Sequence, residues 1–241
     1  MPNCFLEQTP NGLVLKSILP ELSGQFQLDY LQGNMGFRLT PERVLHEPLA
    51  KVIDNKKAWV IDATGGLGKD GLMLAMMGCK VWMCEAHPLL YPLVQDALKR
   101  AALEAKFDFL NHQDQFRFFP EDAKNILAKL AVLPQTERPD ILYLDPMFPA
   151  RKKSSLVKKE MQWLKAIHDM PIESFRSDRE HGFTGLTSET NLFELALKTA
   201  TKRVIVKRPV HAPTLVPSPS PSFSKTFQSS RFDVYLSCLF F

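Results

Sequence analysis

The sequence predicts an α/β fold, in which helices cover both faces of a mainly parallel sheet and a small β-rich extension comes first. The main observation is that short apolar runs alternate with longer segments of helical spacing from Ala58 onward. Strands joined by crossover helices are buried on both faces, so their sequences are almost continuously apolar. A length of 241 residues and a hydrophobic content of 45% are typical of a globular protein with a sizeable core.

The N-terminal extension is predicted to span residues 1–40. Residues 13–18 and 24–31 are β-like and are separated by proline, serine and glycine, so we expect them to pair as a hairpin. Residues 31–38 contain glycine and asparagine and are expected to form a turn.

The main domain is predicted to span residues 41–241. Thr40 is a suitable N-cap and Pro41 a suitable first residue for a helix over residues 40–53. The strands that follow are predicted at residues 58–63, 80–86, 116–122, 140–145, 202–208 and 231–240. The helices between them are predicted at residues 69–78, 88–105, 123–133, 154–168 and 191–200. Residues 212–224 are rich in proline and serine and are expected to be a loop.

Two of these helices carry further signals. Gly78 can cap the end of the helix over residues 69–78. The helix over residues 88–105 has apolar residues near helical spacing, which predicts its buried face. These residues are Leu90, Leu93, Val94, Ala97, Leu98 and Ala101.

The loop DATGGLGKDG, between the first strand of the main domain and its helix, lies where a parallel sheet binds ligands. Gly66, Gly68 and Gly71 match the G-x-G-x-x-G pattern, so a dinucleotide site is one interpretation. Asp62, four residues before Gly66, gives the order D-x-x-x-G-x-G. That order resembles the first motif of class I S-adenosylmethionine (SAM)-dependent methyltransferases. A tight turn without a ligand is the remaining alternative.

Two further acids follow the next strands. Glu85 ends the second strand, where a carboxylate can accept both ribose hydroxyls of a nucleotide or of SAM. Asp122 ends the third strand, and in class I methyltransferases an acid at this point resembles the residue that contacts the adenine amino group. The alternatives are a charge at a helix N-terminus for Glu85 and an N-cap for Asp122.

The fourth strand ends in Asp145-Pro146-Met147-Phe148, which resembles the (D/N)PP(Y/F) motif of methyltransferases acting on planar nitrogens. An aryl amine is a poor nucleophile, because its lone pair is delocalised into the ring. The Asp145 carboxylate and the Pro146 carbonyl can bind the amine hydrogens and direct the lone pair toward the methyl group. Phe148 offers a face on which the base can stack. These three residues are the catalytic candidates, and a strand-terminating turn is the alternative.

Five segments together resemble the bacterial ribosomal RNA small subunit methyltransferase J family: DATGGLGKD, DPMFP, KKSSLVKKEM, ATKRVIVKRPVHAP and RFDVYL. The resemblance implies a Rossmann-like class I methyltransferase fold with a seven-stranded sheet. It implies SAM as cofactor, S-adenosylhomocysteine as product, and methylation of the exocyclic N2 of one guanosine in small-subunit (16S) ribosomal RNA. The implied cofactor contacts are Asp62, Gly66, Gly68, Lys69, Asp70, Glu85, Ala86, Asp122, Ala123 and Asp145. No metal is implied. Lys69 stands where the family favours arginine, and it keeps the charge but loses the fork of donors.

The resemblance gives the basic segments a role, since RNA phosphates would pass beside the fourth strand's end. The implied RNA contacts are Arg151, Lys152, Lys153, Lys158, Lys159, Lys207 and Arg208. Ordinary solvated surface charge is the alternative for part of this set. The implied partner is small-subunit ribosomal RNA or the assembled 30S subunit, and no obligate protein partner is evident.

Composition narrows the remaining classes. The four cysteines have no metal-binding spacing, and no apolar run has the length of a membrane helix. The N-terminus lacks the basic region followed by an apolar stretch that is typical of a signal peptide. We therefore expect a cytoplasmic protein with free thiols, no metal and no membrane association. Two functional alternatives stay open. One is an N-methyltransferase of the same fold acting on DNA or on protein glutamine, and the other is an NAD-binding oxidoreductase or a non-catalytic nucleotide-binding module.

Overall fold

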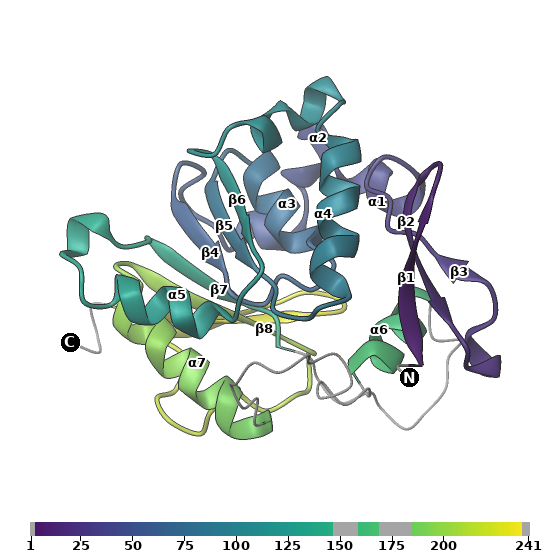
Figure 1. Cartoon of the computed structure of the whole chain (residues 1–241). Coiled ribbons are helices and arrows are strands. Elements are labelled where there is room, and N and C mark those ends of the chain that lie inside the picture. Colours follow the sequence, from purple (N-terminus) through teal and green to yellow (C-terminus); the bar gives the residue numbers. More distant parts are fainter. Residues whose placement is uncertain (1–2, 147–158, 169–184, 238–241) are drawn as a thin grey trace.

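The computed structural model describes residues 3–146, 159–168 and 185–237. A seven-stranded sheet runs through the molecule in the order β6-β5-β4-β7-β8-β10-β9 (Figure 1). Its strands are β4 (Trp59–Asp62), β5 (Lys80–Cys84), β6 (Phe116–Phe119), β7 (Ile141–Leu144), β8 (Arg203–Arg208), β9 (Phe223–Thr226) and β10 (Arg231–Leu236). The first five pair in parallel, and β10 is antiparallel to both β8 and β9. The predicted Rossmann-like, mainly parallel sheet of seven strands is confirmed.

Helices cover both faces of this sheet (Figure 1). One face packs against α3 (Lys69–Met76) and α4 (Leu90–Ala101), and the other against α5 (Ala123–Leu130) and α7 (Gly185–Thr199). All six apolar residues predicted for the buried face of α4 are buried. Gly78, with a φ of 100°, follows the end of α3 as predicted. Short 3-10 helices connect the elements at Pro20–Leu22, Pro48–Lys51, Ala105–Asn111 and Gln135–Glu137.

The N-terminal extension is a three-stranded antiparallel sheet, which corrects the predicted hairpin. It contains β1 (Cys4–Thr9), β2 (Gly12–Ser17) and β3 (Gln25–Phe26). The predicted pairing is present as β2–β3, but the longer pairing is β1–β2. The turn between them, Pro10-Asn11, leads into Gly12 at a φ of 111°, a conformation that only glycine adopts easily. This turn is the sequence feature from which β1 could have been predicted.

Residues 31–38 are not the predicted turn, because α1 (Gly33–Arg38) forms there. Gly36 serves close packing instead, since a Cβ at this position would lie 2.2 Å from the Leu31 carbonyl oxygen. The predicted helix over residues 40–53 begins at Pro41 as expected, but α2 (Pro41–Val44) is only four residues long. Pro48 lacks the N–H that would continue it, and a separate 3-10 helix begins there.

Several other boundaries differ from the prediction. The strand predicted over residues 116–122 ends at Phe119, because Pro120 cannot donate to the ladder. The loop predicted over residues 212–224 gives way to β9 at Phe223, which pairs with β10 along the sheet edge. The last strand ends at Leu236 within the described residues. Helix α6 (Lys159–His168) is the described part of the helix predicted over residues 154–168.

The pleat of the central strands decides which side chains face α3. Val60, Ile141 and Ile205, on β4, β7 and β8, belong to the same buried cluster as α3. Side chains two residues apart on a strand lie on the same face. The next residue on this face of each strand is polar, and the three are Asp62, Tyr143 and Lys207.

Candidate active site

The glycine loop, residues 63–68 between β4 and α3, combines an open glycine with a packed one. Gly66 and Gly68 have φ values of +51° and +71°. A Cβ on Gly68 would lie 2.7 Å from the Tyr30 hydroxyl oxygen, so this glycine is needed for packing. A Cβ on Gly66 would meet only the Thr64 carbonyl oxygen, at 3.8 Å. Gly66 is therefore the place where a ligand can approach the loop backbone.

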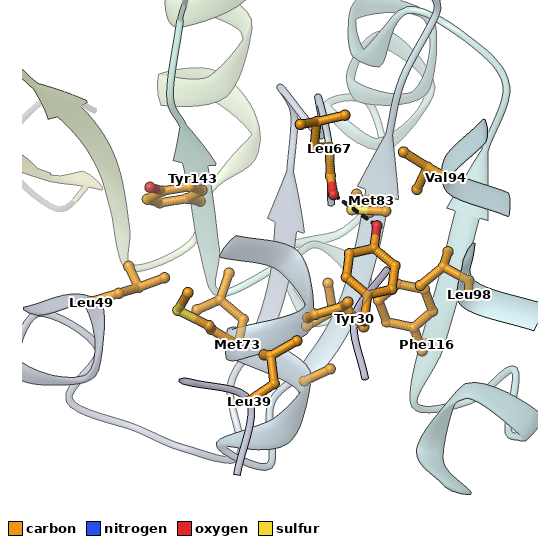
Figure 2. Close-up of a cluster of buried hydrophobic side chains, with 14 of the residues drawn as sticks. Tyr30, Leu39, Leu49, Leu67, Met73, Met83, Val94, Leu98, Phe116 and Tyr143 are labelled. Carbon is orange, nitrogen blue, oxygen red and sulfur yellow. Dashed lines mark hydrogen bonds between the residues drawn. The ribbon is translucent and has the colours of Figure 1, made fainter. Parts of the chain in front are cut away.

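Tyr30, from the N-terminal extension, holds the glycine loop from below. Its buried hydroxyl donates a hydrogen bond to the Leu67 carbonyl at 2.7 Å, and Figure 2 shows the ring among core side chains with its hydroxyl directed at Leu67. Burial keeps the pKa of this hydroxyl above its ordinary value, so it stays a donor. The sequence reasoning missed Tyr30, because its partner is 37 residues away along the chain.

Glu85 connects the end of β5 to the same loop. One carboxylate oxygen accepts from the Gly66 N–H at 2.8 Å, and the other accepts from the His87 N–H at 2.7 Å. Burial raises the pKa of Glu85 to about 7, against the effect of these hydrogen bonds. Each carboxylate oxygen can accept a second hydrogen bond, so Glu85 can still bind ribose hydroxyls. Ala86 is exposed next to it.

Asp62 lies beneath the loop with only 1% of its surface exposed. It accepts a hydrogen bond from the Thr64 N–H at 3.1 Å. Burial, with the nearby Asp70 carboxylate as a second cause, raises the pKa of Asp62 to about 8. At neutral pH Asp62 is therefore mainly protonated, and it shapes the turn without adding a full negative charge.

Lys207 joins two of the predicted site residues. Its ammonium nitrogen lies 2.7 Å from an Asp70 oxygen and 2.8 Å from Asp145 Oδ2. The Tyr143 hydroxyl donates to the same Asp70 oxygen at 2.5 Å. The Asp145 N–H donates to Thr64 Oγ1 at 2.6 Å, which fixes the end of β7 against the glycine loop. The result is a row of three charged groups in which Lys207 is central.

The charges in this row depend on one another. Burial raises the pKa of Asp145, and the Lys207 ammonium only partly opposes this. Burial also acts on Asp70, but Lys207 and the hydrogen bond from Tyr143 bring its pKa below the ordinary value. The two carboxylates in turn hold the pKa of Lys207 above its ordinary value despite burial. Lys207 is thus a permanent cation in contact with Asp145.

This position gives Lys207 partners that the sequence reasoning did not foresee, since it grouped Lys207 with the phosphate contacts. Arg208, grouped with it, is 6% exposed, and its Nε donates to the Pro213 carbonyl. The alternation of side chains along β8 could have predicted this position of Lys207. Val204 and Val206 face α5 and α7, so Ile205 and Lys207 face α3 and the ligand end of the sheet.

Two predicted cofactor contacts have structural partners. Asp122 caps α5 by accepting from the Lys124 N–H at 2.9 Å, so the N-cap alternative is confirmed. Ala123, the first residue of that helix, is buried. The Lys69 ammonium forms an ion pair with Glu160 of α6. Cofactor contacts by these residues stay predictions.

Several predicted residues lie outside the described part of the chain. These are Phe148, Arg151, Lys152, Lys153 and Lys158. Lys159 begins α6, and Pro146 is buried directly after Asp145.

The described ranges contain no group of three side chains that could together hold a metal ion. No helix in those ranges is long and apolar enough to cross a membrane. Cys4, Cys79 and Cys84 are free and buried, as expected for structural thiols.

Comparison with known proteins gives a consistent result. A family model described as "Putative SAM-dependent methyltransferase" matches residues 2–173 and 183–237. Ribosomal RNA small subunit methyltransferase J of Thioalkalivibrio sulfidiphilus is 36% identical over 229 residues, which cover 94% of this chain and 82% of that protein. The protein of the same name from Aeromonas hydrophila is 35% identical over 240 residues, covering 98% and 88%.

One solved structure is similar over nearly the whole length. It is a SAM-dependent methyltransferase of Neisseria gonorrhoeae, with a TM-score of 0.66 and 26% sequence identity. The match covers 98% of this chain and 84% of that one. The fold described above is therefore shared with a methyltransferase over nearly all of this chain.

Proposed function

This chain belongs to the family of SAM-dependent methyltransferases that includes ribosomal RNA small subunit methyltransferase J, and we propose that it methylates the exocyclic N2 of a guanosine in small-subunit (16S) ribosomal RNA. The observation that carries the proposal is the position of the Asp145 carboxylate. It lies at the carboxyl end of β7, tied through Thr64 to the glycine loop. An acceptor for the amine and a cradle for the cofactor are thereby joined in one site.

The residues of the loop and of the strand ends fit SAM. The cofactor supplies a methyl group on a positively charged sulfur. Glu85 would accept the ribose hydroxyls, and the open backbone at Gly66 would allow the close approach that a bound cofactor needs. Ala86 and the Asp122–Ala123 turn would lie on the adenine side.

Asp145 then acts on the amine. Its carboxylate would accept a hydrogen of the N2 amine, so that the nitrogen lone pair points toward the methyl group. As the nitrogen–carbon bond formed, the methyl–sulfur bond would break and leave S-adenosylhomocysteine, and the nitrogen would become positive. It would then pass a proton to the Asp145 carboxylate. A carboxylate next to it would stabilise that positive charge without reorganisation, since Lys207 binds the Asp145 carboxylate and Thr64 binds the backbone N–H of the same residue.

The target guanosine must leave its stack to reach Asp145. Phe148 is the predicted stacking partner, and the cations at residues 151–159 are the predicted phosphate contacts. Similarity to the two proteins named for ribosomal RNA supports this substrate. The test below distinguishes naked RNA from the assembled 30S subunit as the substrate. A cytoplasmic location is part of the proposal.

The proposal is tested with RNA from a strain that lacks the gene. Mass spectrometry of its small-subunit ribosomal RNA should show the loss of one N2-methylguanosine. Purified protein with isotopically labelled SAM should restore that methyl group on the isolated RNA or on 30S subunits. Unchanged RNA in the deletion strain, or methyl transfer only to DNA or to protein glutamine, would overturn the proposed substrate. Calorimetry that detected NAD but not S-adenosylhomocysteine would overturn the reaction class.

A further inference from the structure

We propose that Lys207 and Asp145 together read the Watson–Crick edge of the target base, and that Lys207 makes guanine the accepted purine. This inference rests on the proposed function, because it concerns the base that reaches Asp145. It assigns to Lys207 a contact with the substrate that differs from the phosphate contact predicted from the sequence.

The contact between the two side chains creates a row of hydrogen-bonding groups. Lys207 Nζ, which only donates, lies 2.8 Å from Asp145 Oδ2, which as part of a carboxylate only accepts. The second carboxylate oxygen of Asp145 continues the row. The order is therefore donor, acceptor, acceptor.

Guanine carries the complementary order. Its Watson–Crick edge has the O6 acceptor, then the N1–H donor, then the N2 amine, which also donates. Lys207 would donate to O6 while the Asp145 oxygens accept from N1–H and from the amine that receives the methyl group. Adenine has an amino donor in the O6 position and a lone pair at N1. It would set a donor against the ammonium and a lone pair against the carboxylate, so the remaining ammonium donor and the carboxylate oxygens would face groups that they cannot bind.

The exposure of the three charged groups shows which of them can meet a base. The side chain of Asp70 is 19% exposed, that of Lys207 28% and that of Asp145 40%. Asp70, which also accepts from Tyr143, is thus the inner anchor, and Lys207 and Asp145 are at the accessible end. A lysine ammonium has three N–H donors, of which Asp70 and Asp145 take two. Asp70 is accordingly a positioning residue for Lys207.

The test compares guanine with 2,6-diaminopurine at the target position. Diaminopurine keeps the N2 amine but has adenine's groups at positions 6 and 1. The target nucleotide is first located by mass spectrometry and is then replaced in small-subunit ribosomal RNA by splinted ligation. The wild-type protein should prefer guanine by about 100-fold or more in kcat/KM, since two hydrogen-bonding positions are mismatched. In Lys207→Met this preference should fall to about tenfold or less.

The ratio separates base reading from a purely structural role, because a general loss of site geometry lowers both rates together. Lys207→Arg keeps a donor and should retain the preference for guanine. Asp70→Asn combined with Lys207→Met removes the unpaired inner charge and provides a second variant if the single one folds poorly. Lys202→Met is the matched control, since Lys202 pairs with Asp140 at the opposite end of β8.

The outcomes distinguish this inference from the proposed function. An unchanged preference in both Lys207→Met variants, with N2-methylguanosine still formed, would overturn base reading by Lys207 and leave the proposed function standing. Absence of N2-methylguanosine with the wild-type protein would overturn the proposed function and this inference with it. A reduced preference in Lys207→Met, retained in Lys207→Arg and Lys202→Met, is the expected result.

Discussion

At the level of single residues, the three aspartates of the site differ in pKa because their surroundings differ. Burial raises the pKa of Asp62 to about 8, whereas Lys207 brings that of Asp70 below its ordinary value. Asp145 is more exposed and shares Lys207 with Asp70. Lys207 therefore opposes the effect of burial on the pKa of both carboxylates that it contacts, at the end of β7 where the amine would bind. The base of the glycine loop is nearly neutral.

Asp145→Ala should abolish methyl transfer, a loss of about 100-fold or more, because no acceptor then orients the amine or stabilises its developing charge. Affinity for S-adenosylhomocysteine should stay within a few-fold, since Glu85 and the glycine loop are unchanged. Single-turnover methyl transfer and calorimetry measure the two quantities. Asp145→Asn retains one acceptor and should have an intermediate rate. A near-normal rate in Asp145→Ala would refute the orienting role.

Glu85 gives a prediction about stability and pH. Its pKa is raised from an ordinary value of 4.5 to about 7 in the folded protein, so folding favours the protonated form. This contribution is fully present below pH 4.5 and is lost as the pH rises to about 7. Relative to Glu85→Gln, the wild-type free energy of unfolding should fall by up to about 3 kcal/mol across this window. Urea denaturation at several pH values measures the difference. Parallel pH profiles of the two proteins would contradict the raised pKa.

At the level of elements, the glycine loop and α3 form a unit whose glycines have separate tasks. Gly66 leaves space for a ligand, while Gly68 turns the chain into α3 directly over Tyr30. The loop carbonyl of Leu67 is bound to Tyr30, and Glu85 accepts from the Gly66 N–H. The loop is thus held from two sides before any ligand arrives, which lowers the entropy cost of binding.

Gly68→Ala should destabilise the protein by more than Gly33→Ala does. Both glycines have a left-handed φ, of +71° and +60°, so both substitutions incur strain of about 1–2 kcal/mol. Only at Gly68 would the added Cβ also approach the Tyr30 hydroxyl, at 2.7 Å, whereas nothing lies within 4 Å at Gly33. Urea denaturation of both variants gives the comparison. Equal losses would show that the loop tolerates the Cβ.

The sheet and the loop could be predicted from sequence because both depend on local patterns. Apolar runs, helical spacing and the glycine order gave β4 to β8, α3, α4 and the positions of Glu85 and Asp145. The roles of Tyr30 and Lys207 depend on contacts across 37 and 62 residues of chain, which no local pattern records. The side of the sheet that Lys207 faces could have been predicted from strand alternation, and β1 could have been predicted from the Pro10-Asn11 turn. For Asp122 the general N-cap signal predicts its observed contact, and its contact with the cofactor stays a prediction.

At the level of the whole molecule, the N-terminal extension and the main sheet share one hydrophobic core. Cys4, Leu15 and Tyr30 belong to the same buried cluster as Met83 and Leu98. Figure 2 shows Tyr30, Met83 and Leu98 of this cluster. Phe26 of β3 also stacks on Trp163 of α6, with ring centroids 6.3 Å apart. A change in the extension can therefore reach the glycine loop through packed side chains. Tyr30 is the most direct of these connections.

Tyr30→Phe tests that connection. The ring keeps its place in the core, but the Leu67 carbonyl loses its buried donor, which should cost about 1–2 kcal/mol of unfolding free energy. Affinity for S-adenosylhomocysteine should also fall several-fold, because the loop is then held less firmly. Tyr91→Phe is the matched control, since the Tyr91 hydroxyl accepts only from Gln95 among its described contacts and lies on the partly exposed side of α4. Urea denaturation and calorimetry measure both effects. If Tyr30→Phe lost stability but bound S-adenosylhomocysteine as tightly as Tyr91→Phe, the extension would stabilise the fold without supporting the glycine loop.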